Sequence, residues 1–225
     1  RAAATIFMGI GVRIPSRYWI AGQWTDAAAT PFTADTTDAQ DAGADDFAME
    51  TTTASDGYVV ASRVPFNAIG INVGVASVGA GVVRTWRHTN RTGAGWVAST
   101  TDETIVSTAV GAAAGTNYAI GENVIVITPM TDWGQTQVGG LSGIPGGYFA
   151  INVRATTAPT TAGLATAIEL YRIYFIREAV TDNTVIESPS WVESPAFMPY
   201  GDMLVPFFSS SNLGNRITAL VRSGW

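Results

Sequence analysis

The residues that could carry chemistry in this chain are few, and the first group is an acidic run near the N-terminus. Calcium prefers several hard oxygen ligands on a flexible loop. The spacing is not that of an EF-hand loop, because no glutamate occupies its final ligand position. We therefore interpret the run as a solvated acidic loop and expect no cofactor, with a calcium site as the weaker alternative. Its candidate ligands are Asp35, Asp38, Asp41, Asp45 and Asp46.

The single histidine, His88, has no second histidine with which to share a metal ion. A catalytic serine triad would need an aspartate and an activated serine beside it, and the sequence contains no Gly-x-Ser-x-Gly motif. The absence of cysteine excludes a disulfide framework, a thiolate zinc site and a cysteine nucleophile. We expect His88 to be a surface residue at the end of a strand, and we expect a protein that is not an enzyme.

The tryptophans offer a different chemistry, because indole rings can stack on the faces of sugars. Trp86, Trp96 and Trp133, with Tyr148, could form such a platform on one face of a sheet. In β-sandwiches the same residues more often fill the core or its ends, and this is the interpretation that we favour. A platform for a surface glycan stays open as the alternative.

The composition suits a subunit that covers much of its surface with neighbours. Charged residues make up 13% of the chain, and all 12 basic residues are arginine. The charged share is about half of the usual ~25%. A net charge of −6 and scattered arginines disfavour nucleic acid as a partner. No apolar run reaches the ~18 residues of a membrane helix, so we expect no membrane partner.

Alternating apolar residues predict strands throughout the middle of the chain. At 69–75 the residues Ile69, Ile71, Val73 and Val75 alternate with small or polar ones, as in a half-buried strand. No segment predicts an amphipathic helix. The pattern indicates an all-β fold, a two-sheet antiparallel β-sandwich of jelly-roll type. Further strands are predicted at 58–64, 82–86, 95–98, 104–110, 124–127, 148–154 and 167–176, with glycine-rich turns between them.

The ends of the chain differ from the middle, which predicts three segments. These are an N-terminal arm with the acidic loop at 1–46, a β-sandwich core at 47–180 and an extended C-terminal arm at 181–225. The C-terminal arm combines prolines, which suppress regular structure, with widely spaced aromatic residues. Exposed aromatics are a solubility liability, so we expect them to dock on a neighbouring subunit or on the core. The expected interface residues are Trp191, Phe197, Tyr200, Phe207, Phe208 and Trp225.

The central block also presents a familiar succession of motifs. In order, it contains Asp56–Phe66, the strand at 69–75, Trp86, Trp96-Val97, Asp102, Pro129, Asp132-Trp133, Gly143 and Tyr148–Arg154. Over residues 50 to 178, this succession resembles the jelly-roll-like β-sandwich structural proteins of tailed phages and related viruses. The resemblance implies a subunit of the capsid-decoration or fibre type.

Three functional hypotheses follow. The first, implied by the resemblance, is a non-enzymatic viral structural protein, a capsid-decorating (cement) subunit assembled in the host cytoplasm and held on the virion surface by its terminal arms. Its partners would be copies of itself and a capsid or other virion protein. The second is a carbohydrate-binding jelly-roll module for host attachment. The third is a subunit of a prokaryotic extracellular filament or surface layer.

Overall fold

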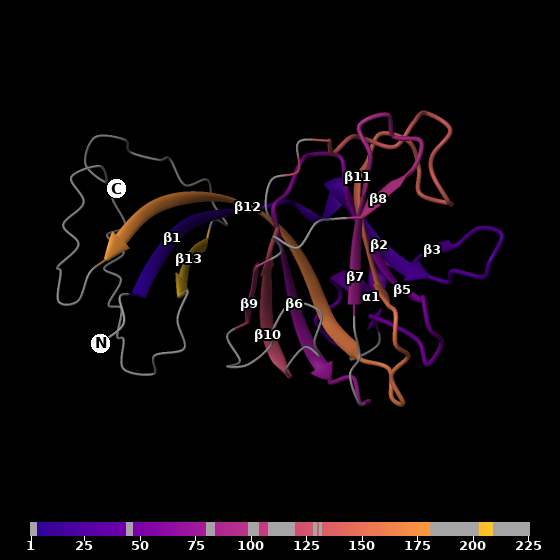
Figure 1. Cartoon of the computed structure of the whole chain (residues 1–225), viewed down its shortest axis with the longest axis horizontal. Helices are drawn as coiled ribbons and strands as arrows, with labels where there is room; N and C mark the ends of the chain where they lie inside the picture. The colour runs from indigo at the N-terminus through magenta and orange to yellow at the C-terminus, as the bar shows by residue number, and fades with distance from the viewer. Residues whose placement is uncertain are drawn as a thin grey trace.

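The computed structural model describes residues 4–43, 47–79, 84–98, 104–107, 120–127, 130, 132–180 and 203–208. In these residues the chain forms two antiparallel sheets that pack face to face, which confirms the predicted all-β sandwich. The sandwich lies at one end of the molecule, and a narrow extension of one sheet projects from it (Figure 1).

The two sheets, called A and B, contain nearly all of the regular structure. Sheet A has the strand order β13-β1-β12-β6-β10-β9, with β4 also paired to β12, and sheet B has the order β3-β2-β5-β11-β7-β8. The strands of sheet A are β1 (Ala4–Arg13), β4 (Phe47–Ala48), β6 (Ala68–Val75), β9 (Thr104–Ser107), β10 (Gly121–Val126), β12 (Leu164–Val180) and β13 (Met203–Phe208). Those of sheet B are β2 (Trp19–Trp24), β3 (Phe32–Ala34), β5 (Gly57–Ser62), β7 (Arg84–Thr89), β8 (Trp96–Ala98) and β11 (Phe149–Ala155).

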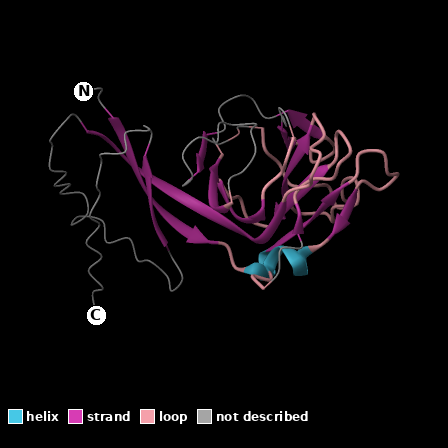
Figure 2. Ribbon diagram, turned by 90° about the horizontal axis from the view of Figure 1, so that it is seen from below, coloured by secondary structure: helices cyan, strands magenta, loops and turns pink. Residues whose placement is uncertain are grey.

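Two short helices lie on the same side of the sandwich (Figure 2), the 3-10 helix η1 (Ser16–Tyr18) and the α-helix α1 (Thr36–Gln40). The sequence did not predict α1, because five residues are too few to show helical periodicity. In the described part of the chain, no helix is long and apolar enough to cross a membrane.

Strands β4 to β12 follow the order of a jelly roll. Within this segment, sheet A contains the neighbours β4-β12-β6-β10 and sheet B contains β5-β11-β7-β8. The chain therefore passes from one sheet to the other between most successive strands, as in the double Greek key of a jelly roll. All of these strands lie within the predicted core segment, 47–180.

Sequence alternation places apolar side chains between the two sheets, as predicted for β6. Ile69, Ile71 and Val73 are buried, whereas Asn72 on the opposite face is exposed. These three apolar residues of β6 belong to one buried cluster with residues of sheet B such as Tyr58. Removing apolar surface from water stabilises such a core by ~25 cal/mol per Å².

Residues 14–43 belong to the sandwich rather than to an arm. β2 pairs with β5 along its whole length, and Trp19 and Ala21 enter the core between the sheets. Ala39 of α1 enters the same core. The predicted boundary at residue 46 therefore does not coincide with an edge of the sandwich, because strand pairing, invisible in the local pattern, recruits β2 and β3.

Past the sandwich, β12 continues as part of a three-stranded ribbon, which we define as β1, β13 and residues 172–180 of β12. β1 pairs with residues 171–180 of β12, and β13 pairs with the other side of β1. The ribbon stands clear of the two packed sheets in Figures 1 and 2. Segments from opposite ends of the chain thus lie side by side within it.

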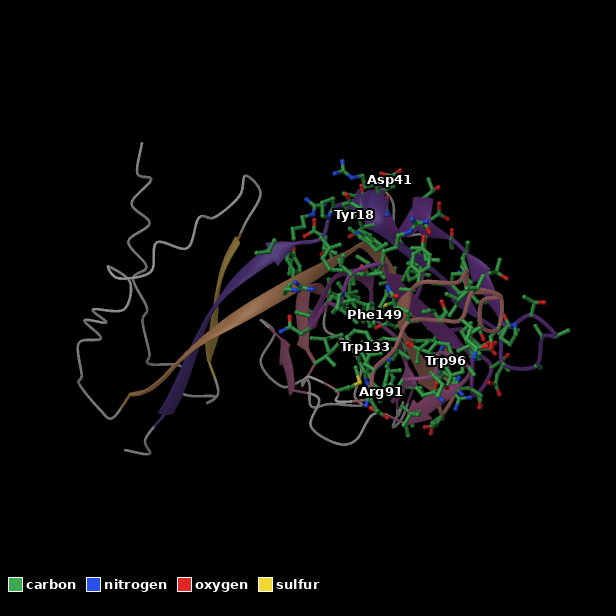
Figure 3. The ribbon with its side chains drawn as sticks, turned by 90° about the horizontal axis from the view of Figure 1, so that it is seen from above. Tyr18, Asp41, Arg91, Trp96, Trp133 and Phe149 are labelled. Carbon is green, nitrogen blue, oxygen red and sulfur yellow. The ribbon has the colours of Figure 1, made fainter. Side chains whose placement is uncertain are left out.

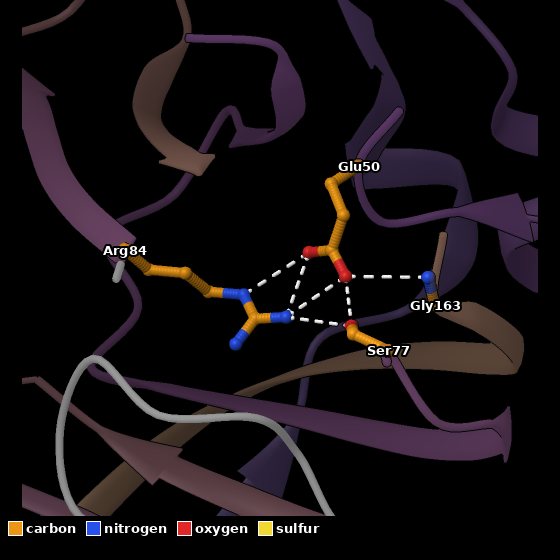
Figure 4. Close-up of polar contacts among 4 residues, drawn as sticks. All are labelled: Glu50, Ser77, Arg84 and Gly163. Atoms are coloured by element: carbon orange, nitrogen blue, oxygen red, sulfur yellow. Dashed lines mark hydrogen bonds and ion pairs between the residues drawn. The ribbon is translucent and has the colours of Figure 1, made fainter. Parts of the chain in front are cut away.

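A buried ion pair connects the two sheets (Figure 4). Nη2 of Arg84 donates to both carboxylate oxygens of Glu50, at 2.9 and 2.7 Å, and Nε donates to one of them at 3.1 Å. The hydroxyl of Ser77 and the backbone N–H of Gly163 donate to the same carboxylate. The side chains of Glu50 and Arg84 are each 1% exposed. Opposite charge and several donors thus meet the buried carboxylate, as a buried ion needs.

Candidate functional site

The outer face of sheet B, which points away from sheet A, gathers polar and aromatic residues from several strands. Its buried apolar residues form a second cluster, which includes Val59 and Tyr148. Gly57 begins β5, and a Cβ there would come within 1.9 Å of the carbonyl oxygen of Val153. The strand register aligns residues of neighbouring strands in rows across this face. The first row contains Trp24, Gly57, Arg154 and Thr85. The next two rows contain Val59, Asn152 and Arg87, and then Thr89 and Trp96.

The guanidinium of Arg87 lies against two indole rings. Its Cζ is 5.1 Å from the ring centroid of Trp24 and 5.5 Å from that of Trp96. The two rings meet edge to face at a centroid distance of 5.6 Å. Nε and Nη2 of Arg87 donate to Oδ1 of the buried Asn152, at 3.1 and 2.6 Å. Cation–π contacts and a neutral amide thus hold this charge, and none of these groups is an anion.

An ion pair lies beside this stack. Nη1 of Arg154 is 2.7 Å from Oδ1 of Asp26, and their side chains are 20% and 41% exposed. The indole N–H of Trp24 donates to the same aspartate oxygen at 3.1 Å. The ion pair and the stack therefore share Trp24. We call Trp24, Asp26, Arg87, Trp96 and Arg154 the tryptophan–arginine cluster.

The cluster carries two positive charges and one negative charge. Burial and the nearby charge of Arg154 lower the pKa of Arg87 to about 10, although Asp26 acts in the opposite direction. Partial burial alone would raise the pKa of Asp26, but hydrogen bonds from Trp24 and Arg154 and the two arginine charges outweigh it and lower that pKa. The local field therefore favours a further negative charge, in a protein whose net charge is −6.

Unsatisfied polar atoms gather on the same face. Among the described residues, four buried side-chain polar atoms have no hydrogen-bond partner. Three belong to the outer face, Nε1 of Trp96, Nε of Arg154 and Oγ1 of Thr85, and the fourth is Nε1 of Trp86. An unsatisfied buried group costs ~1–3 kcal/mol. Two of these atoms are donors of the tryptophan–arginine cluster, so its hydrogen-bonding capacity is incompletely used.

The three tryptophans singled out by the sequence do not share a platform. Trp86 is 5% exposed and lies in the core between the sheets. Trp133 packs partly buried between Phe66 and Phe149, at ring-centroid distances of 5.0 and 5.5 Å (Figure 3). Trp96 lies on the other face of sheet B, with Trp24 as its aromatic neighbour.

His88 lies in the interior, so its predicted surface position is wrong. It is 3% exposed, and its Nε2 is 2.8 Å from Oδ1 of Asp132. β7 lies between β11 and β8, so both of its backbone edges are paired. Strand alternation places His88 on the same face as Trp86, which enters the core between the sheets.

The acidic run surrounds α1. Asp35 precedes the helix, Asp38 lies within it and Asp41 follows it. A hydrogen bond with Asp35 and the charge of Asp35 raise the pKa of Asp38. Asp45 and Asp46 lie outside the described residues. In the part of the chain that the structure describes, no three acidic or histidine side chains converge on a common point.

The aromatic residues predicted for the C-terminal interface divide into two groups. Phe207 and Phe208 lie in β13, where their backbones pair with Phe7 and Ile6 of β1. The other four fall outside the described residues; they are Trp191, Phe197, Tyr200 and Trp225.

Sequence reasoning missed most of the tryptophan–arginine cluster. The alternation at 148–154 does place Asn152 and Arg154 on the face opposite Ile151 and Val153. That signal identifies a polar second face, but it does not reveal the partner. Asp26, the partner of Arg154, is 128 positions away in sequence.

Comparisons with protein-family models, with characterised proteins and with solved structures found no match to this chain.

Proposed function

We propose that this chain is a structural subunit of a virus particle, a capsid-decorating protein that assembles with copies of itself through the ribbon. The observation that carries the assembly part of this proposal is an open strand edge. On the side opposite β1, β6 pairs with β12 only as far as Tyr171. Among the described residues, no strand pairs with that side of residues 172–180. An unpaired edge of this length offers a row of backbone donors and acceptors to another chain.

The amino-acid content of the ribbon supports assembly. Within β1, residues 172–180 and β13, the charged residues are Arg13, Arg172, Arg177 and Glu178, and most others are apolar. Monomeric proteins avoid long apolar edges of this kind or block them. The outer edge strand β13 contains Pro206, which has no N–H to donate. Residues 172–180 contain no proline, so the edge of β12 is the better one for pairing.

The placement of such a subunit on a virus particle rests on the resemblance of residues 50–178 to phage structural proteins. The jelly-roll order of β4 to β12 is compatible with that role, although a fold alone does not determine function. A prokaryotic filament or surface-layer subunit would use the same edge. A decorating subunit closes into an oligomer of fixed size, whereas a filament subunit forms open chains, so the shape of the assembly separates the two.

Light scattering of the purified full chain at micromolar concentration tests the proposal. We expect a discrete oligomer whose mass falls to that of the monomer in the separate variants Phe175→Lys and Ile176→Lys. A lysine in an edge strand opposes pairing with another strand. Ile120→Lys is the matched control, since Ile120 is 68% exposed outside the ribbon and its replacement introduces the same charge. Far-ultraviolet circular dichroism verifies that each variant is folded.

A wild-type chain that stays monomeric, or folded ribbon variants that keep the wild-type mass, would overturn assembly through this edge. Negative-stain electron microscopy of the wild type tests the decorating role. Closed particles of uniform size support it. Open filaments would replace it with the filament hypothesis.

A further inference from the structure

The tryptophan–arginine cluster lies in sheet B, away from the ribbon, and the proposed assembly does not use it. Among the described residues, Asp26 is the one carboxylate beside the two arginines, and both arginines are only partly exposed to water. Arg87 is bound by rings and an amide, and the one carboxylate in the cluster, that of Asp26, is paired with Arg154. A partly buried cation that no described carboxylate contacts directly is a favourable position for an external anion.

The orphaned donors indicate an oxygen-rich ligand. Nε of Arg154 and Nε1 of Trp96 are both N–H donors, and both belong to the cluster. Oγ1 of Thr85 is directly across the strand pair from Arg154. A carboxylate accepts hydrogen bonds through two oxygens, and arginine binds it with more than one N–H. An external carboxylate would match this charge. It would reach the two donors only once the side chains turn to expose them, since both nitrogens are buried in this conformation.

The aromatic ring and the aspartate narrow the ligand class further. Trp96 is partly exposed, and aromatic rings beside a polar group are suited to the C–H faces of a sugar. The carboxylate of Asp26 is 41% exposed and accepts hydrogen bonds, so it can accept them from sugar hydroxyls. An anion without hydroxyl groups would also be attracted by the arginines, but it could donate no hydrogen bond to Asp26 and would only be repelled by that carboxylate.

We propose that the tryptophan–arginine cluster binds a sugar that carries a carboxylate, a uronic acid unit of an acidic glycan. In this arrangement the ligand carboxylate lies next to Arg154 and Arg87, the sugar ring lies against Trp96, and a hydroxyl group donates to Asp26. This site is not the sugar-stacking platform of Trp86, Trp96 and Trp133 considered from the sequence, because Trp96 is the one tryptophan that belongs to both.

Isothermal titration calorimetry of the full chain tests the proposal with three probes: tetragalacturonate, the neutral galactose tetramer and free galacturonate. We expect binding of tetragalacturonate, weaker binding of the monomer and no binding of the neutral tetramer. Affinity should fall as sodium chloride is raised, because salt screens the charge contribution. Equal affinity for the charged and neutral tetramers would overturn the proposal, and so would no heat up to about 1 mM probe.

Two substitutions in one ion pair give opposite expectations. Arg154→Gln removes a cation that the ligand contacts and should weaken tetragalacturonate binding by about tenfold. Asp26→Asn breaks the same ion pair and keeps a side-chain oxygen that can accept from the sugar hydroxyl. Because it removes the repulsive charge, it should tighten binding by about threefold. If the ion pair served only to hold the fold, both variants would weaken binding or leave it unchanged, and that result would overturn the proposal.

Arg63→Gln is the matched control. Arg63 also lies over an aromatic ring, 5.3 Å from the centroid of Tyr148, and its Nε donates to the hydroxyl of that tyrosine at 3.2 Å. It is not part of the cluster, so Arg63→Gln should bind tetragalacturonate with wild-type affinity. Weakening by this variant as large as that by Arg154→Gln would show that net charge, rather than the cluster, determines binding. Failure of the glycan experiment leaves the oligomer measurement unaffected, since that experiment uses residues of the ribbon.

Discussion

Arg84 and Arg87 lie on the same strand, β7, and meet opposite environments. Arg84 points between the sheets and is almost completely buried, with the carboxylate of Glu50 as its counter-ion. Arg87 points to the outer face, is partly buried, and contacts two indole rings and an amide. A carboxylate contacts the first charge directly, whereas no carboxylate of the described residues forms an ion pair with the second.

The degree of burial separates a structural role from a binding role for these two charges. A cation that is fully buried must have its counter-ion within the fold, because an unpaired charge there would be too costly. A cation at a partly exposed face can tolerate incomplete compensation, since water screens it, and it keeps affinity for an external anion. The pair at Glu50 and Arg84 is therefore structural, and the cluster around Arg87 is the better candidate for binding.

The sharpest test of this contrast is Arg84→Met. The substitution leaves the carboxylate of Glu50 buried without its cation, and we expect it to lower the free energy of unfolding by about 3–5 kcal/mol. Urea denaturation followed by circular dichroism measures the change. The double variant Arg84→Met with Glu50→Leu removes both charges and should recover a large part of the loss. A loss below about 1 kcal/mol in the single variant would contradict a structural role for the Glu50–Arg84 ion pair.

The corresponding change on the outer face, Arg87→Met, should be much milder. It removes two hydrogen bonds to Asn152, but it also removes a charge whose burial is unfavourable, as the lowered pKa of Arg87 indicates. We expect a loss of about 1 kcal/mol in the same denaturation experiment. A loss as large as that of Arg84→Met would remove the distinction between the two arginines.

The pH dependence of Asp26 tests how strongly the outer ion pair is coupled. Its carboxyl has a pKa below the ordinary value of 3.8. A carboxylate with a lowered folded-state pKa stabilises the fold above the unfolded pKa, and that contribution is lost as pH falls through the folded pKa. The stability of the wild type should therefore fall relative to Asp26→Asn as the pH drops below about 4, by less than about 1 kcal/mol because the pair is exposed. Parallel pH profiles of the two proteins would show that the pair contributes nothing to folding.

The smallest effect is expected in the acidic segment around α1, where Asp35, Asp38 and Asp41 place like charges close together in the chain. The hydrogen bond with Asp35 and its charge raise the pKa of Asp38. Folded-state stability is then lost as pH rises through that raised pKa, so Asp38→Asn should melt slightly higher than the wild type at neutral pH. The difference should vanish in acid, where both proteins lack the charge. Thermal melts at neutral and acidic pH provide the measurement, and a lower melting temperature for Asp38→Asn at neutral pH would contradict the expectation.

The parts of the structure that were predictable depend on local periodicity. The alternation at 69–75 predicted both β6 and its buried face, and the runs at 58–64 and 148–154 correspond to β5 and β11. The burial of His88 was not predictable, because it depends on β8 pairing beside β7 and on Asp132 from a distant loop. For the same reason, the segment containing β2 looked like an arm until its pairing with β5 was known.

The amino-acid pattern alone is enough to predict that the chain forms strands, which faces of those strands are apolar, and that the strands pack as a sandwich. Strand alternation is a local property of the backbone, so it can be recognised in any short window. Only the tertiary structure decided that Arg84 meets Glu50 while Arg87 meets Trp24 and Trp96, and that β12 extends beyond β6. These outcomes depend on strand order and register between segments far apart in the chain, and no local pattern encodes those.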